Sequence, residues 1–226
     1  MMPEDLGGSS GSREPSPAVS ALTGFDPGRS AVLSECGRYR YRLERQCAGD
    51  GATLVLMVNP STADAEKDDA TIRKLVGFGN RHRWGRLMVG NLFAYRATDV
   101  RELAAAYDPI GPVNDVYLQG MANEADRVIC AWGPVSKVPL RLRCRWQVVW
   151  GELPMRLATY SIGAPAKCGH PRHPLMLAYS EPLLAWGPPA SAMSARQGQD
   201  PQGLEAKPAS ATGAAGDAQT PSEPTP

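Results

Sequence analysis

Two polar segments of this chain contain most of the residues that could do chemistry. The first is Asn-Pro-Ser-Thr at 59–62, which is followed by an acidic stretch that ends at Asp69. The second is Gly-His-Pro-Arg-His-Pro at 169–174, which holds two of the three histidines in the chain. Amides, hydroxyls, carboxylates and imidazoles can orient water, bind phosphate and transfer protons. The two segments can share one site only if the fold brings them together.

The first segment suggests several roles. Asn59 could orient a water molecule through its amide oxygen, although an amide cannot ionise to act as a base. A carboxylate that could accept a proton is offered by Asp64, Asp68 or Asp69. Ser61 and Thr62 could bind a phosphate together with free N–H groups at the start of the next helix, or only satisfy the backbone of the loop. The acidic residues could also cap that helix or hold Mg²⁺.

The second segment offers hydrogen-bond donors. His170, Arg172 and His173 could stabilise negative charge that develops on a leaving group in a cleft poor in water. The alternative is that two rings flanked by proline only stiffen a loop. Because polar loop residues often carry function, we predict catalytic roles for His170 and His173 and a binding role for Arg172.

Hydrophobic patterning predicts the elements that position these segments. Short apolar runs rich in β-branched residues are typical of buried strands, and they alternate here with amphipathic stretches typical of helices. The predicted strands are 53–58, 86–93, 127–132 and 156–162, and the predicted helices are 69–83, 99–106, 112–123 and 175–186. This order indicates a three-layer α/β/α domain with a mostly parallel sheet. Open sheets of this type bind ligands at the carboxyl ends of their strands.

Residues that follow other strands should lie at the same edge. Asn91 and Arg96 come at or after the end of the second predicted strand, so we predict that both bind substrate. Trp132 ends the third and could stack on a base, although an aromatic residue there is more often part of the core. A basic group could follow a phosphate backbone or form a solvated helix face; its members are Arg73, Lys74, Arg81, Arg83 and Arg86.

Two regions show the period of two that is typical of strands. Residues 31–47 alternate around a Cys-Gly turn, which predicts a β-hairpin at the edge of the sheet. One face would carry Tyr39, Tyr41 and Leu43, and the other would carry Arg38, Arg40, Arg42 and Glu44. We interpret the arginines as a solvent-exposed face rather than a binding surface. In 134–155, where prolines interrupt any helix, arginines alternate with apolar residues.

Composition sets the domain limits. The 226 residues include 23 glycines and 21 prolines, and the two ends of the chain lack the apolar content needed to form a core. We predict disordered tails at 1–20 and 187–226 around an α/β domain at 21–186. The formal net charge is +1, but residues 21–186 hold 21 Lys and Arg against 16 Asp and Glu, and this core charge of +5 permits a phosphate-bearing partner without demanding one. No apolar run approaches the roughly 20 residues of a membrane helix, no secretory start is evident, and the five cysteines form no CxxC pair. We expect a cytoplasmic protein with reduced thiols and no membrane partner.

Five runs carry a family resemblance, and they are MVNPSTADAEKDDATIRK, VGNLFAYRATD, DPIGPVND, ADRVICAWG and GHPRHPL. In this order they resemble bacterial and phage members of domain-of-unknown-function family 1643, over about residues 31–186. Membership implies no reaction. Ala70 stands where the family commonly has proline, and 134–155 lack the helix that usually follows the Ala-Trp-Gly turn.

A second resemblance suggests a reaction. Asn59-Pro60, with His170-Pro171 or His173-Pro174, is similar in order and position to loops of uracil-DNA-glycosylase-like proteins. The resemblance implies that Asn59 and Pro60 place the attacking water and that the histidine loop stabilises the departing base or grips the backbone. We therefore predict an N-glycosidase-like hydrolase that acts on nucleic acid or a nucleotide, without a cofactor or metal. A non-catalytic module that binds the same ligands is the alternative. A metal-dependent phosphoesterase is a third reading, although the dense His/Asp ligand set of such sites is missing. The oligomeric state stays open.

Overall fold

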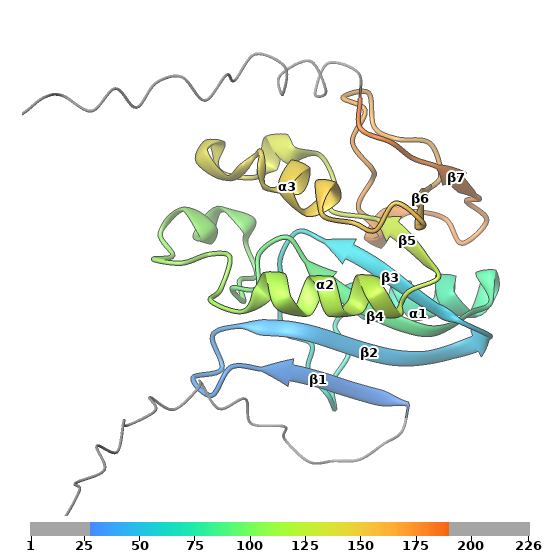
Figure 1. Cartoon of the computed structure of the whole chain (residues 1–226), viewed down its shortest axis with the longest axis horizontal. Coiled ribbons are helices and arrows are strands. Elements are labelled where there is room, and N and C mark those ends of the chain that lie inside the picture. The colour runs from blue at the N-terminus through green and yellow to red at the C-terminus, as the bar shows by residue number, and fades with distance from the viewer. Residues whose placement is uncertain (1–27, 190–226) are drawn as a thin grey trace, which may run out of the picture. The chain divides into compact units, whose positions relative to one another are not determined.

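The computed structural model describes residues 28–189, which form a mixed seven-stranded sheet flanked by helices (Figure 1). The strands are β1 (Arg29–Leu33), β2 (Arg40–Gly49), β3 (Ala52–Met57), β4 (Trp84–Asn91), β5 (Arg127–Cys130), β6 (Ala158–Ile162) and β7 (Leu183–Ala185). The α-helices are α1 (Ala70–His82), α2 (Asn114–Glu124) and α3 (Arg145–Gly151). Short 3₁₀ helices are η1 (Val100–Ala104), η2 (Val135–Lys137), η3 (Leu140–Leu142) and η4 (Pro174–Met176). The predicted disordered tails lie outside the described residues, apart from Gly187–Pro189.

The sheet has the order β1-β2-β4-β3-β5-β6-β7 and a parallel centre. Strands β4, β3, β5 and β6 pair in parallel, whereas β1, β2 and β7 add antiparallel edges. All six residues of β3 are buried, because α1 covers one face of the sheet while α2 and α3 cover the other (Figure 1). The predictions of an α/β domain with a parallel core and an edge hairpin are confirmed.

Helix α1 begins and ends where the sequence predicts. The carboxylate of Asp69 accepts a hydrogen bond from the Ile72 N–H at 2.9 Å, which caps the first turn. Ile72, Leu75 and Phe78 are buried against the sheet at helical spacing. Arg83 ends the helix with φ of 55°, the left-handed conformation common at helix C-termini.

An irregularity in β2 reverses part of the predicted hairpin faces. Arg42 pairs with Val32 but Arg40 pairs with the next residue, Leu33, so β2 contains one extra residue, as in a β-bulge. Arg42 accordingly reaches Glu124 on the α2 side of the sheet. Arg40 turns to the α1 side, where it is 2% exposed and donates to the Ala63 carbonyl at 2.9 Å. The prediction that Arg40 is solvent-exposed is therefore wrong.

Two further predictions of local structure are wrong. Residues 134–155 form η2, η3 and α3 instead of a strand-like segment, because Trp146 and Val149 are buried at a spacing of three. The predicted helix at 175–186 is instead η4 followed by β7. That strand pairs antiparallel with β6, whose edge would otherwise be open. The capping box predicted at Asp99 is present, but the helix that it starts is the 3₁₀ helix η1.

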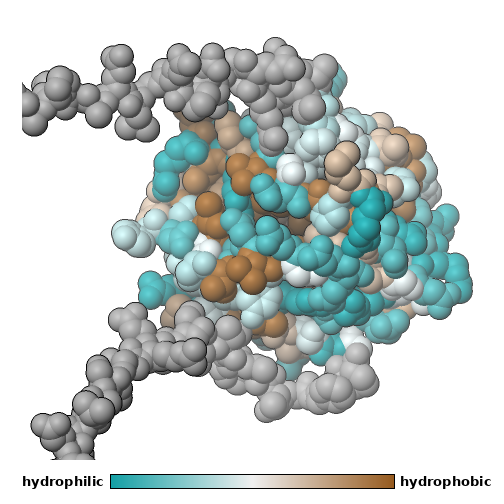
Figure 2. All heavy atoms as spheres, viewed as in Figure 1, coloured by the Kyte–Doolittle hydropathy of each residue, from teal (hydrophilic) through white to brown (hydrophobic). Residues whose placement is uncertain are grey.

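On the side of α2 and α3, Figure 2 shows hydrophobic patches among hydrophilic neighbours. The strongly exposed apolar side chains of this region belong to Val116, Leu140, Val148 and Met155. No helix within residues 28–189 is both long enough and apolar enough to span a membrane.

Candidate functional site

A cavity of 580 Å³ opens at the carboxyl ends of the parallel strands. Its walls come from the residues after β3, the end of β4, the turn after β5, the first turn of α1, η1 with the residues before it, and the late histidine loop. Four predicted site residues line it, namely Asn59, Ser61, Asn91 and His173. This is the edge at which open α/β sheets bind ligands. The fold thus brings the two polar segments together.

The loop before α1 is held by arginines from other elements. Every backbone carbonyl from residue 61 to residue 66 accepts a hydrogen bond from a guanidinium. The donors are Arg96 to Ser61 and Thr62, Arg40 to Ala63, Arg45 to Asp64, and Arg29 to Ala65 and Glu66. The carboxylate of Asp68 then pairs with both Arg29 and Arg45. These bonds fix the loop that connects Asn59 to the start of α1.

Several predicted residues have structural partners and do not line the cavity. The Asp64 carboxylate accepts from the N–H groups of Glu66 and Lys67 and closes a turn. Burial raises its pKa, but these donors and nearby positive charges outweigh burial, so the pKa lies below its usual value. Arg96 is used by the carbonyls of the loop, Pro60 is buried, and Thr62 is exposed.

The two histidines of the late loop have different surroundings. His170 is 7% exposed, packs edge-on against Trp146 and does not line the cavity. Arg172, which is also outside the cavity, bonds the Ala164 carbonyl and pairs with Glu181. His173 lines the cavity and packs against Gly133, where φ of +80° lets the chain turn sharply after β5. Only His173 is placed to meet a ligand.

Asn59 has an amide whose orientation is fixed. Its Nδ2 donates to the Ala97 carbonyl at 2.7 Å and to the Pro60 carbonyl at 3.1 Å. No donor within residues 28–189 reaches its Oδ1, so the oxygen is the part of the amide left for water or ligand.

Arg40 makes the cavity suited to an anion. Its side chain is almost fully buried, its Nε has no hydrogen-bond partner, and no carboxylate of the described residues forms an ion pair with it. Burial lowers the pKa of Arg40 to about 10, against the opposing charge of Asp69, so the group stays positive at neutral pH. Ala70 and Thr71, whose N–H groups open α1, line the same cavity, as does Lys137. A helix N-terminus beside a buried guanidinium favours a negatively charged group.

Two more buried polar side chains line the cavity without a partner. Asn91 is 1% exposed, and neither its amide oxygen nor its amide nitrogen has a hydrogen-bond partner among the described residues. Trp132 is 4% exposed, stacks near Trp146 and leaves its Nε1 unpaired. An unpaired buried polar group costs about 1–3 kcal/mol, which a ligand or water in the cavity would recover.

His173 can act as a neutral donor. Its Nδ1 accepts from the Leu175 N–H at 3.3 Å, which leaves the proton of the neutral ring on Nε2. Burial lowers the pKa of His173, the positive charge of Lys137 lowers it further, and Asp69 opposes both. The ring is therefore neutral at pH 7.

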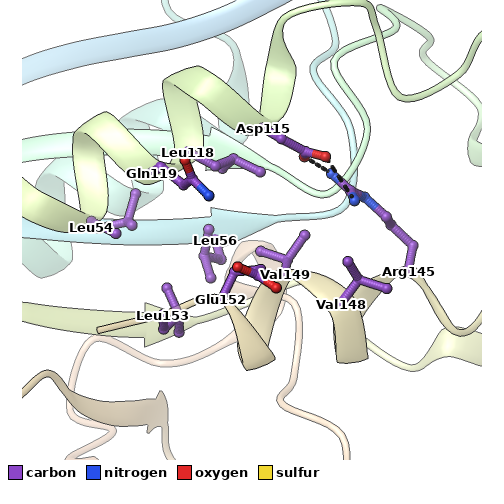
Figure 3. A pocket seen from close by; sticks show the side chains of 11 residues that line it. Leu54, Leu56, Asp115, Leu118, Gln119, Arg145, Val148, Val149, Glu152 and Leu153 are labelled. Atoms are coloured by element: carbon purple, nitrogen blue, oxygen red, sulfur yellow. Dashed lines mark hydrogen bonds and ion pairs between the residues drawn. The ribbon is translucent and has the colours of Figure 1, made fainter. Parts of the chain in front are cut away.

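A second cavity, of 190 Å³, lies between α2 and α3 on the face of the sheet that is opposite to α1 (Figure 3). Its walls are mostly leucine and valine side chains, including Leu54, Leu118 and Val149. At its rim Arg145 and Asp115 form an ion pair, as Figure 3 shows. None of its lining residues has a side-chain polar atom that is both buried and without a hydrogen-bond partner among the described residues. Within residues 28–189 no three His, Cys, Asp or Glu side chains are grouped so that they could hold a metal ion.

The fold and the strand-end cavity define an α/β protein with a cavity at the carboxyl ends of its parallel strands. A family model described as "Protein of unknown function (DUF1643)" matches residues 40–175, and the chain belongs to this family. The matched range contains every residue that lines the strand-end cavity, from Arg40 to Leu175. No curated protein and no solved structure matches the chain.

The low pKa of His173 gives a first testable prediction. The imidazole should titrate below the ordinary value of about 6.5, and Lys137→Gln should raise its pKa by removing a positive charge. The ring binds a proton more weakly in the folded protein than in the unfolded chain. Its contribution to stability is therefore lost as the pH drops from about 6.5 through the folded pKa. Proton NMR of the histidine rings, assigned with His→Gln variants, measures both. Titration at or above 6.5 would contradict the described surroundings.

Proposed function

We propose that the strand-end cavity binds a nucleotide unit and that the protein hydrolyses its N-glycosidic bond. The observation that carries the proposal is Arg40, a buried positive charge without an ion-pair partner that lines a cavity beside a helix N-terminus. A buried charge without a partner is costly unless a ligand supplies the opposite charge. A phosphate would meet this need.

The phosphate would lie between Arg40 and the first turn of α1. Arg40 offers its Nε–H, and Ala70 and Thr71 offer backbone N–H groups from a helix of 13 residues. Ser61 lines the same wall and can donate a hydroxyl. The guanidinium and the two amides are donors only and the Ser61 hydroxyl can also donate, as a phosphate requires.

The base would lie at the ends of β4 and β5. Asn91 offers one donor and one acceptor that have no other use, and the edge of every nucleobase presents such a pair. The unpaired indole N–H of Trp132 gives a further donor. A ring held here would recover the cost of burying these groups.

The reaction needs a water, a base and a donor to the leaving group. Asn59 Oδ1 would orient the water, and Asp69, which lines the cavity, would accept its proton as the oxygen attacks the sugar carbon. Asp64 and Asp68 are less suitable because neither lines the cavity and both carboxylates are bonded elsewhere. Asp69 caps α1 through Oδ1, which leaves its Oδ2 for the water. As the glycosidic bond breaks, its electrons pass to the base, which His173 Nε2–H would stabilise.

The proposed hydrolysis agrees with the resemblance to uracil-DNA-glycosylase-like proteins. What supports it is that Asn59 and His173, one from each of its two loops, line one cavity. His170 is not part of this proposal, and neither is a metal-dependent phosphoesterase, because Asp68 pairs with two arginines.

Replacing Arg40 tests the anion site. Arg40→Met should lower affinity for nucleoside monophosphates and for inorganic phosphate at least tenfold, because the buried positive charge is lost. Without ligand the stability of the variant should change little, because relief of the buried unpaired charge offsets the loss of the hydrogen bond to the Ala63 carbonyl. Calorimetric titration and thermal unfolding measure the two effects.

The control for this test is Arg81→Met, which removes an exposed arginine in the last turn of α1. It should leave both affinities unchanged. Equal losses in the two variants, or phosphate binding by Arg40→Met as tight as before, would refute the assignment.

The paired histidines separate catalysis from binding. His173→Gln should lower the rate of base release by about 10²–10⁴, with little change in affinity, if the ring acts mainly in the transition state. His170→Gln is the matched control and should release base at the unmodified rate. The assay follows free base from uracil-, hypoxanthine- or modified-base-containing nucleic acids, nucleotides and nucleosides. If the unmodified protein binds nucleotide but releases no base, the hydrolase is replaced by a binding module.

A further inference from the structure

A second hollow continues the strand-end cavity outward. This outer groove has a volume of 520 Å³ and shares Asp99, Val100, Lys137 and Val138 with the cavity. Its remaining walls are Arg101, Ala104, Ser136, Pro139 and Arg143. A ligand that fills the cavity can therefore extend past Lys137 without leaving the protein surface.

The outer groove is formed by two segments far apart in sequence, η1 on one side and residues 136–143 on the other. Arg141 joins them by donating to the Ala104 carbonyl at 2.8 Å and to the Leu103 carbonyl at 3.4 Å. Arg143 fixes the second wall through the carbonyls of Val138 and Ser136, at 2.9 and 3.0 Å. Side-chain hydrogen bonds therefore hold both walls of the groove in place.

The groove carries a positive charge that the protein does not neutralise. Asp99 pairs with Arg101 and is its only acidic residue. The hydrogen bonds and the charge of Arg101 hold the pKa of Asp99 at about 2, so the pair stays ionised at neutral pH. Arg143 bonds only backbone carbonyls, and neither it nor Lys137 has a carboxylate partner among the described residues. Two positive charges therefore remain for a ligand.

We propose that the ligand is a strand longer than one nucleotide, with the phosphate next to the nucleotide in the cavity lying in the outer groove near Lys137 and Arg143. This rests on the proposed function. Apolar side chains of Val100, Ala104 and Pro139 lie between the charged ones. A flanking sugar or base would cover that apolar surface, whereas the chain of a nucleoside triphosphate would not. The chemistry favours a single-stranded oligonucleotide over a free nucleotide.

The test measures affinity against ligand length at two salt concentrations. A nucleoside monophosphate, the matching triphosphate and a trinucleotide are titrated into the full-length protein. The trinucleotide should bind at least tenfold more tightly than the monophosphate. Its affinity should also fall more steeply with salt, because each further phosphate contact adds about −0.7 to the slope for a single strand. The triphosphate should gain less than the trinucleotide.

Two variants locate the effect. Arg143→Gln should weaken trinucleotide binding several-fold and reduce its salt slope, with monophosphate affinity unchanged, because Arg143 lines only the outer groove. Arg101→Gln replaces a side chain that is 84% exposed, so the variant should fold normally. It should also weaken trinucleotide binding, because it leaves the negative charge of Asp99 unpaired in the groove. Arg81→Gln is the control and should change neither ligand.

The outcomes separate this proposal from the one on which it rests. Monophosphate binding with no gain for the trinucleotide would overturn the strand and leave the nucleotide cavity intact. An equal gain for the triphosphate would assign the groove to a polyphosphate instead. Failure of all three ligands to bind would overturn both proposals.

Discussion

The arrangement of this protein depends on arginine side chains that hold the backbone of one loop. Six successive carbonyls between β3 and α1 accept hydrogen bonds from four guanidiniums, which come from β1, β2 and the segment after β4. A loop with so many polar backbone groups could not pack against a sheet unless those groups were paired. Of the acidic residues that look like a ligand cluster in the sequence, Asp68 serves the same purpose as the counter-ion for two of the arginines. Asp64 and Asp69 instead accept from backbone N–H groups of the loop and of α1.

Fixing this loop leaves a hollow above the strand ends and decides what lines it. Arg40 uses one nitrogen to hold Ala63, while its Nε stays unpaired and the residue forms part of the cavity wall. The same side chain is thus a structural support and the main positive charge of the site. Burying it without a counter-ion costs stability, as is common where a binding site is prepared for a charged ligand.

The sequence predicts the framework well because β3, β4, β5 and α1 each follow one clear hydrophobic period. It also predicts that Asn59, Ser61, Asn91 and His173 follow the ends of strands or lie in the late loop, and all four line the cavity. It does not find Arg40, because a single extra residue in β2 reverses the face that simple alternation assigns. A bulge leaves no clear signal in one sequence.

Other errors have a similar local cause. His170 and His173 both precede proline in one hexapeptide, so composition alone cannot separate the ring beside Trp146 from the ring in the cavity. In residues 134–155 the alternating arginines imitate a strand, yet their guanidiniums mainly bond carbonyls of 3₁₀ turns and nearby loops. Such contacts are set by tertiary packing, which overrides a short-range pattern.

The proposed function depends on a phosphate that binds between Arg40 and the first turn of α1. Its most direct test is a titration of the ¹⁵N-labelled protein with a nucleoside monophosphate, observing the Arg40 Nε–H, the Ala70 and Thr71 amides and the Asn91 side-chain amide by NMR. The account predicts that these signals shift together and saturate at one ligand concentration. Shifts confined to exposed basic residues such as Arg81, or no shifts at the Arg40 Nε–H, would contradict it.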